Sequence, residues 1–204
     1  MTVRLLPFGP AAWLLEVEAG GDVLAAATAL TRSEVVNEVV PGACTVLVHL
    51  APGGDYDAIG RHLLELVARA EGRVVDDRSH VVELAVTYDG EDLAAVADAC
   101  SLTTAEVISR HTNATYRAAF CGFAPGFAYL TGLDPALELP RRPTPRTRLA
   151  AGSVAIAAGY SAVYPTASPG GWHLIGHTDA VLFAADRDPP ALIAPGTTVH
   201  FVPT

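Results

Sequence analysis

The sequence predicts an α+β protein of two domains, a plait over residues 1–82 followed by a β-barrel over residues 83–204. In the first part, apolar residues recur at helical spacing between short strand-like runs, which is typical of an α+β plait. In the second part, short β-type runs alternate with Gly and Pro, which is typical of a closed or partly closed barrel. The pattern changes after Asp89-Gly90, so we expect the boundary between residues 80 and 90.

The plait is expected to follow the order strand, strand, helix, strand, strand, helix, strand, with both helices on one side of an antiparallel sheet. Apolar residues from Val23 to Leu30 predict the first helix, after Gly20-Gly21. The second helix ends before Gly72 and has one apolar face, formed by Ile59, Leu63, Leu66, Val67 and Ala70. The strand-like runs are residues 11–18, Val35–Val40, Thr45–Leu50 and Val81–Tyr88, with a Pro41-Gly42 turn between the second and the third.

The barrel domain is expected to begin with two short helices, Leu93–Ala99 and Ala105–Arg110. A capping box at Thr103 and Glu106 introduces the second helix. The β-type runs that follow are Tyr116–Phe120, Ser153–Ala157, Ala162–Tyr164, Trp172–Ile175, Val181–Ala184 and Thr198–Phe201.

The composition is that of a folded globular protein, with 50% hydrophobic and 17% charged residues. A net charge of -9 argues against a general nucleic-acid binder, which would show a basic face. All 13 basic residues are arginine, which excludes a Schiff-base lysine and a P-loop. Cys44, Cys100 and Cys121 form no CxxC pair, so neither a zinc knuckle nor a disulfide framework is expected, and Cys121 is predicted to be buried. Without a secretory signal or an apolar run of membrane-spanning length, we expect a cytoplasmic protein.

One stretch stands out in this acidic chain, because no Asp or Glu lies between Leu139 and Thr178. It contains two histidines and the segment 140–148, where prolines separate four arginines: Arg141, Arg142, Arg146 and Arg148. Arginines gathered without carboxylates attract anions, and their forks suit carboxylates and phosphates. Solvated arginines on a loop are the alternative.

Two Pro-Gly-aromatic blocks frame this stretch, residues 120–129 and 168–172. Pro followed by Gly favours a type II turn. Gly170 and Gly171 would let backbone N–H groups form an anion-binding nest, or would make a tight turn before a strand. The aromatic residues of the first block can equally be barrel core: Phe120, Phe123, Phe127 and Tyr129.

Three histidines invite a functional interpretation. His173 and His177 are four residues apart, but on a strand this spacing is about 13 Å, too far for one metal ion, so no metal site is expected. Either of them can face a ligand as a donor or proton carrier. His111 lies at a predicted helix C-terminus, where the helix dipole favours the protonated form in a capping or a catalytic role.

A series of motifs in order along the chain resembles the family that includes KipI, the B-type (PxpB) subunit of 5-oxoprolinase and allophanate-hydrolase subunit 1. The resemblance covers almost the whole length. The motifs are Val40-Pro-Gly, His111-x4-Tyr116, Gly122-Phe-x-Pro-Gly-Phe-x-Tyr-Leu130, Pro140-Arg-Arg-x-x-Pro-Arg146, Ala151-Gly-Ser-Val154, Tyr164-Pro-x-x-Ser-Pro-Gly-Gly-Trp172 and Ile175-Gly-x-Thr178.

The resemblance implies a ferredoxin-like N-terminal domain and a cyclophilin-like β-barrel. It also implies a subunit, inactive alone, of an enzyme that opens 5-oxo-L-proline to L-glutamate at the expense of ATP. The expected partners are a KipA-type subunit, which is the C-type component of 5-oxoprolinase, and a third component of the LamB/YcsF type. ATP with Mg²⁺ would be bound mainly by these partners, and neither nucleic acid nor membrane is expected as a partner. The alternatives are a KipI-type inhibitor of a sensor histidine kinase and a carboxyltransferase or allophanate-hydrolase-like subunit of urea degradation.

Residues and resemblance together give a predicted site for a small anionic substrate. The predicted catalytic residues are His111, Arg146 and His177. The predicted substrate-binding residues are Phe123, Pro125, Gly126, Phe127, Tyr129, Arg141, Arg142, Ser153, Tyr164, Ser168, Gly170, Gly171 and Trp172.

Overall fold

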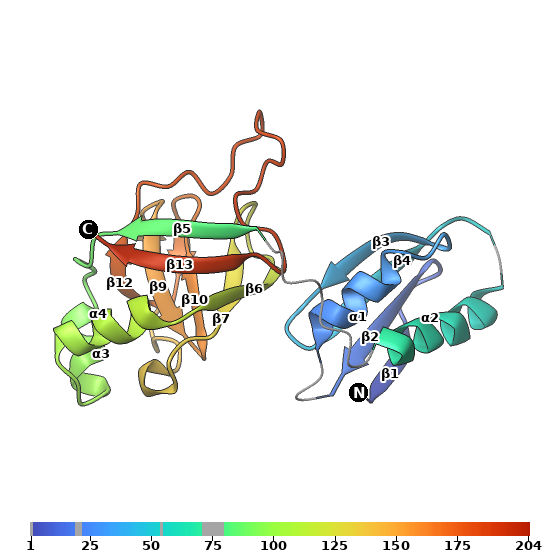
Figure 1. Ribbon diagram of the computed structural model, residues 1–204, viewed down its shortest axis with the longest axis horizontal. Helices are drawn as coiled ribbons and strands as arrows, with labels where there is room; N and C mark the ends of the chain where they lie inside the picture. The colour runs from blue at the N-terminus through green and yellow to red at the C-terminus, as the bar shows by residue number, and fades with distance from the viewer. Residues whose placement is uncertain (1, 19–21, 54, 71–79) are drawn as a thin grey trace. The chain divides into compact units, whose positions relative to one another are not determined.

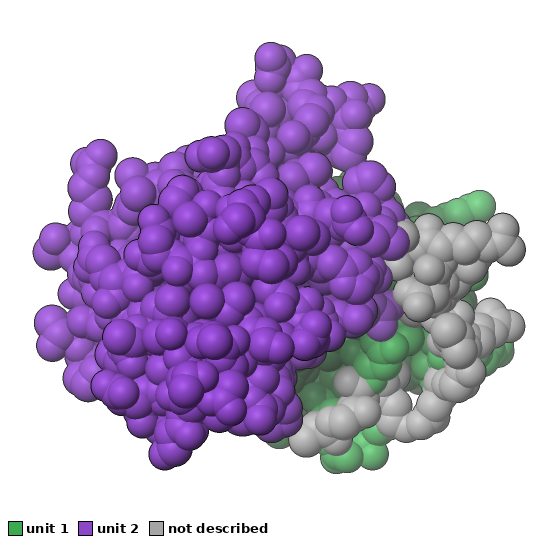
Figure 2. Space-filling model, turned by 60° about the vertical axis from the view of Figure 1, so that its left-hand side comes forward, with its two compact units in different colours: residues 1–78 green, residues 79–204 purple. Residues whose placement is uncertain are grey.

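The computed structural model describes residues 2–18, 22–53, 55–70 and 80–204. The chain divides into two compact units, residues 1–78 and residues 79–204 (Figure 2). The predicted helix-flanking glycines Gly20, Gly21 and Gly72 lie outside the described residues.

The first unit is a four-stranded antiparallel sheet with two helices. The strands are β1 (Val3–Pro7), β2 (Ala12–Val17), β3 (Val36–Pro41) and β4 (Thr45–Leu50), in the spatial order β1-β2-β4-β3. The helices α1 (Val23–Leu30) and α2 (Tyr56–Ala70) pack their apolar faces on the sheet, which buries Leu15, Leu30 and Leu63 completely. The predicted helices and internal strands of this unit are confirmed, with β1 as the first strand of the predicted order.

The expected last strand of the plait is wrong. β5 (Val81–Val86) pairs in parallel with β13 (Thr198–Pro203) and so belongs to the second unit. The alternation of buried and exposed residues in β5 predicts a strand, but it does not identify the partner strand.

The second unit is a seven-stranded barrel. Its strands follow the order β12-β9-β10-β7-β6-β13-β5, and a backbone bridge between Thr87 and His177, with two N–H···O contacts of 2.9 Å, joins the two edges (Figure 1). The predicted α+β fold with a barrel is confirmed. The remaining barrel strands are β6 (Tyr116–Cys121), β7 (Ala128–Thr131), β9 (Ser153–Ala157), β10 (Tyr160–Val163) and β12 (His173–His177).

Helices α3 (Leu93–Ala99) and α4 (Thr104–Asn113) pack against each other and against the barrel strands β12 and β13 (Figure 1). The predicted capping box is confirmed, because Thr103 and Glu106 exchange side-chain and backbone hydrogen bonds at the start of α4. A short 3₁₀ turn, η1 (Pro135–Leu137), follows β7. Within the described part of the chain, no helix combines the length and apolar character needed to cross a membrane.

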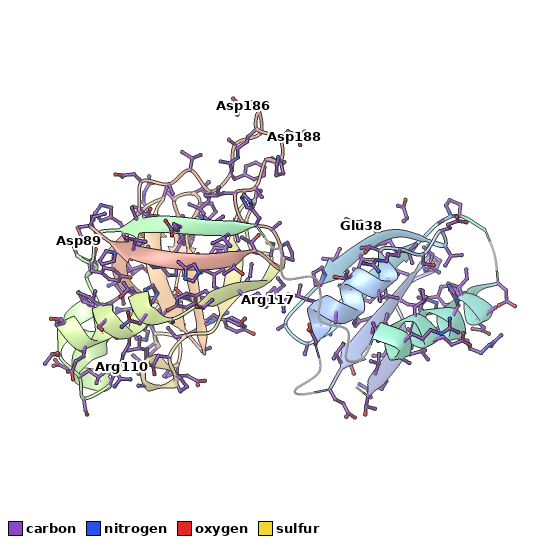
Figure 3. The ribbon with its side chains drawn as sticks, in the orientation of Figure 1. Glu38, Asp89, Arg110, Arg117, Asp186 and Asp188 are labelled. Atoms are coloured by element: carbon purple, nitrogen blue, oxygen red, sulfur yellow. The ribbon has the colours of Figure 1, made fainter. Side chains whose placement is uncertain are left out.

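The predicted strand Val181–Ala184 is wrong. Only Phe183 forms a bridge, with Ala191, inside the long segment between β12 and β13. This segment projects from the barrel, with Asp186 and Asp188 at its tip (Figure 3). The Arg187 guanidinium donates to backbone carbonyls within the segment, including those of Val181 and Pro190. Leu182 and Ala184 also form backbone hydrogen bonds with Leu192 and Pro190, so the β-type residues are held within the segment itself and not by a barrel strand.

Candidate functional site

The two Pro-Gly-aromatic blocks meet on the barrel. Phe127 from the first block packs edge-on against Trp172 from the second, with ring centres 5.8 Å apart, and against Tyr164 at 5.3 Å. These three side chains are at most 5% exposed, whereas Phe123 is 61% exposed beside them. We call the whole group the aromatic cluster: Phe120, Phe123, Phe127, Tyr129, Tyr160, Tyr164 and Trp172.

The first block forms the predicted type II turn. The Phe127 N–H donates to the Ala124 carbonyl at 3.0 Å, and Gly126 has a φ of 83°, as the third residue of such a turn requires. Just before it, the Ala124 N–H donates to the Gly122 carbonyl across Phe123, whose φ is 70°. A three-residue turn with positive φ at a non-glycine residue is rare and strained. The exposed Phe123 ring is therefore held at the rim of the cluster by an unfavourable backbone conformation.

The second block is not a turn. Ser168–Gly170 form the short strand β11, which pairs with β8 (Arg146–Leu149) and places Gly170 opposite Arg146. Neither Gly170 nor Gly171 has the positive φ that an anion-binding nest needs, so the predicted nest is wrong. The reason for glycine is close packing, because a Cβ on Gly170 would lie 2.5 Å from the Tyr164 hydroxyl oxygen and 2.6 Å from Leu149 Cδ1.

This packing predicts opposite outcomes for neighbouring glycines. Gly170→Ala is expected to lower the free energy of unfolding by about 1–3 kcal/mol, because the added methyl overpacks the site. Gly171→Ala is the matched control, since its Cβ would meet nothing closer than 3.7 Å. Urea unfolding of both variants tests the difference, and equal stabilities would show that Tyr164 and Leu149 do not enclose Gly170.

A buried carboxylate lies among the arginines of segment 140–148. Asp92 is 3% exposed and accepts hydrogen bonds from Arg142 Nη1 and from both terminal nitrogens of Arg146, at 2.8 and 2.9 Å. The backbone N–H of Leu174 donates to the same carboxylate at 2.8 Å. The stretch 139–178 contains no acid of its own, but Asp92 neutralises it from outside, and exposed Glu91 adds a contact of 3.1 Å to Arg146. The inference of uncompensated arginines is thus corrected at Arg142 and Arg146.

The charge state of Asp92 follows from these contacts. Burial alone would raise the pKa of Asp92, but the Arg146 hydrogen bond, the Leu174 N–H and the charges of Arg146 and Arg142 hold that pKa below its usual value. Asp92 is therefore a carboxylate at neutral pH. Two guanidinium groups face this one buried negative charge.

Arg141 is in a different position. It is exposed and forms no ion pair within the described residues. The backbone on both sides of it is bonded to the residues that flank Trp172. The Arg142 N–H donates to the Gly171 carbonyl at 2.8 Å, and His173 Nε2 donates to the Pro140 carbonyl at 2.9 Å.

Arg141 also acts on the aromatic cluster through its charge. Burial raises the pKa of Tyr164 to about 12, and the positive charge of Arg141 opposes that increase. The structure thus holds the backbone of Arg141 next to the residues that flank Trp172, and the charge of Arg141, which has no carboxylate partner among the described residues, acts on Tyr164.

The predicted serines lie below this surface. Ser153 is buried, and its hydroxyl donates to the Ala150 carbonyl at 2.8 Å. Ser168 Oγ is buried without a hydrogen-bond partner among the described residues.

His111 lies in the barrel core. It is fully buried on α4, with Nδ1 2.7 Å from the Tyr88 hydroxyl and Nε2 2.9 Å from Ser161 Oγ. The expected protonated form is wrong, because burial lowers the pKa of His111 to about 3 and outweighs the helix dipole. Its two nitrogens anchor α4 to the barrel.

This neutral histidine predicts a pH dependence of stability. The folded-state pKa of about 3 lies below the unfolded value of 6.5, so the stabilisation is present above pH 6.5 and is lost as the pH falls. Between these values the free energy of unfolding is expected to fall by about 1.4 kcal/mol per pH unit. Urea unfolding at pH 7.5 and 5.5 tests this against His111→Gln. Parallel losses in the wild type and the variant would contradict it.

His177 lies at the end of β12 opposite to Trp172. Its Nδ1 donates to Asp89 at 2.8 Å, beyond the end of β5 (Figure 3), and this ion pair raises the pKa of His177. The predicted catalytic roles stay predictions, and of the three residues only Arg146 lies beside the aromatic cluster, through the pairing of β8 with β11. His173 and His177 both lie on the strand β12, so the predicted strand conformation of this pair is confirmed.

Comparison with known proteins places the chain in a family. Residues 3–193 match the family described as carboxyltransferase domain, subdomain C and D. The chain belongs to this family. The B-type subunit of 5-oxoprolinase from Escherichia coli O157:H7 is 40% identical over 173 residues, which are 82% of this chain and 78% of the relative.

Similarity to solved structures supports the fold. TTHA0988 superposes with a TM-score of 0.77 at 33% identity, over 100% of this chain and 40% of that longer chain. The chain thus spans less than half of TTHA0988. The urea carboxylase of Kluyveromyces lactis superposes with a TM-score of 0.72 over 99% of this chain and 22% of its own, but at 20% identity this likeness shows the fold alone.

Proposed function

We propose that this chain is the B-type subunit of a 5-oxoprolinase and that it binds the substrate carboxylate through Arg141. The single observation that supports this most is the position of Arg141, which has no ion-pair partner among the described residues and whose backbone is held next to the residues that flank Trp172. The 40% identity to the E. coli 5-oxoprolinase component also supports the proposal. 5-Oxo-L-proline is a flat lactam with a carboxylate, so the exposed Phe123 ring, which lies against Tyr164, and an arginine fork match its two ends.

The chemistry of the reaction assigns different roles to this chain and to its partners. A lactam is a resonance-stabilised amide, and ATP would activate it by phosphorylating its oxygen. Water would then add to the ring carbon, the C–N bond would break with a proton passing to the nitrogen, and a second water would release phosphate from the resulting acyl phosphate. Arg142 and Arg146 are engaged by Asp92, and no group of three or more His, Cys, Asp or Glu that could hold a metal occurs among the described residues. We therefore assign ATP, Mg²⁺ and the general base mainly to a KipA-type partner and a LamB/YcsF-type component. This chain binds and orients the substrate.

The test is reconstitution. The chain is purified with the two partner components from the same organism, and glutamate formation from 5-oxo-L-proline is measured with and without ATP. Glutamate is expected only with ATP and only when this chain is present. No glutamate from the full set, or equal glutamate without this chain, would overturn the proposal.

A further inference from the structure

Asp92 joins three separate parts of the barrel domain. It immediately precedes α3, yet its side chain makes no capping hydrogen bond to that helix. Instead its two oxygens bind Arg142 and Arg146 of segment 140–148 and the Leu174 N–H of β12. The side chain of Asp92 is 5% exposed, and those of Arg142 and Arg146 are 30% and 21% exposed. Hydrogen bonds between ionised groups in such a setting are short and directional, so they fix position.

The contacts of Asp92 hold two parts of the chain that lie next to Arg141. Arg142 and Arg146 tie the segment that follows Arg141, and Leu174 ties the strand that follows Trp172. Between these points, the Pro140 carbonyl and the Arg142 N–H bond to His173 and Gly171. Without Asp92, two guanidinium groups would lose their shared counterion, and the segment would keep only its backbone bonds and the contact of Arg146 with Glu91.

We propose that Asp92 is the positioning residue of the site: by holding Arg142 and Arg146 it fixes Arg141 beside Trp172 and Tyr164, where Arg141 binds a carboxylate. This inference rests on the proposed function and assigns separate roles to adjacent arginines. Arg142 and Arg146 hold the segment, and Arg141 recognises the anion.

The experiment uses the full chain with Trp13→Phe, so that Trp172 is the single tryptophan. Trp13 stacks on Tyr56 in the first unit, and its Nε1 has no hydrogen-bond partner among the described residues, so phenylalanine can keep the stack. Fluorescence titration compares 5-oxo-L-proline with 2-pyrrolidinone, the same lactam without the carboxylate. In this background the variants are Asp92→Asn, Arg141→Ala and Arg148→Ala, an exposed arginine of the same segment.

We expect Asp92→Asn and Arg141→Ala each to weaken 5-oxo-L-proline binding by about tenfold or more, from the loss of one charge-assisted hydrogen bond. Binding of 2-pyrrolidinone should not change, and Arg148→Ala should bind both ligands as the wild type does. Equal losses for both lactams in Asp92→Asn would mean a merely structural role and overturn the inference. Wild-type affinity in that variant would overturn it too.

A second measurement separates this inference from the proposed function. Phenylglyoxal labels accessible arginines, and peptide mapping gives the rate at each one. We expect fast labelling of Arg141 and slow labelling of Arg142 and Arg146, with about tenfold faster labelling of the latter two in Asp92→Asn. If the wild type binds no 5-oxo-L-proline, the proposed substrate is wrong. Independently of that result, equal labelling rates of Arg142 and Arg146 in Asp92→Asn and the wild type would overturn the role of Asp92. If Asp92→Asn does not fold, Arg146→Gln replaces it, with the same selective loss expected.

Discussion

Arg141→Ala is expected to raise the KM of the assembled 5-oxoprolinase complex for 5-oxo-L-proline by about tenfold to a hundredfold. A hydrogen bond to a charged group contributes about 1.5–3 kcal/mol, which corresponds to that range. The carboxylate of the substrate does not react, so its binding is the same in the ground state and the transition state, and kcat should change little. Steady-state kinetics of the reconstituted complex measure both constants.

The matched control for this prediction is Arg148→Ala. Arg148 lies on β8, is exposed and forms no ion pair within the described residues. Its substitution by alanine therefore removes the same charge from the same segment. A general electrostatic effect would change KM equally in both variants. Equal KM values for Arg141→Ala and the wild type would show that the substrate carboxylate is bound elsewhere.

Asp92→Ala is expected to lower the free energy of unfolding by about 3–5 kcal/mol. Removing one partner of a buried ion pair leaves uncompensated charge, and here two partly buried guanidinium groups lose the same counterion. The Leu174 N–H loses its acceptor as well. Chemical denaturation at neutral pH measures the loss.

Glu91→Ala is the control for this second prediction. Glu91 also contacts Arg146, but its side chain is 74% exposed, so its removal should cost at most about 1 kcal/mol. If both substitutions cost the same, burial of Asp92 would not be the source of the stabilisation.

The sequence predicts most elements of the fold because their signals are local. The capping box at Thr103 and the apolar face of α2 depend on residues within a few positions of one another, and both are confirmed. The partner of β5 depends on a strand more than a hundred residues later, and no local pattern records that pairing. β5 is therefore a strand of the seven-stranded barrel, although the sequence predicts it as the last strand of the plait.

In the candidate site, too, the local features can be predicted from the sequence and the long-range contacts cannot. The arginines, the aromatic residues and the Pro-Gly pairs are visible in the sequence, and the structure brings them together. Asp92 is not visible as part of the site, because an acidic residue just before a helix has an ordinary explanation as a cap. Its actual partners lie 50 and more positions away. An acid-free stretch in a chain is thus no guide to the charge around it in space.

Identical dipeptides in the two blocks illustrate how context decides backbone structure. Pro125-Gly126 forms a type II turn, and Gly126 packs against Phe183 and Leu182 of the projecting segment. Pro169-Gly170 is extended, because Gly170 must pass over the Tyr164 hydroxyl. The first glycine is required for its φ and the second for its lack of a side chain.

The most direct test of the substrate site is a crystal structure of the full chain with 5-oxo-L-proline. We expect the ligand carboxylate at about 2.7–3.2 Å from the Arg141 guanidinium, beside Trp172 and Tyr164, with Asp92 still bound to Arg142 and Arg146. A carboxylate on Arg142 or Arg146 with Asp92 displaced, or a ligand bound away from the aromatic cluster, would contradict the proposed site.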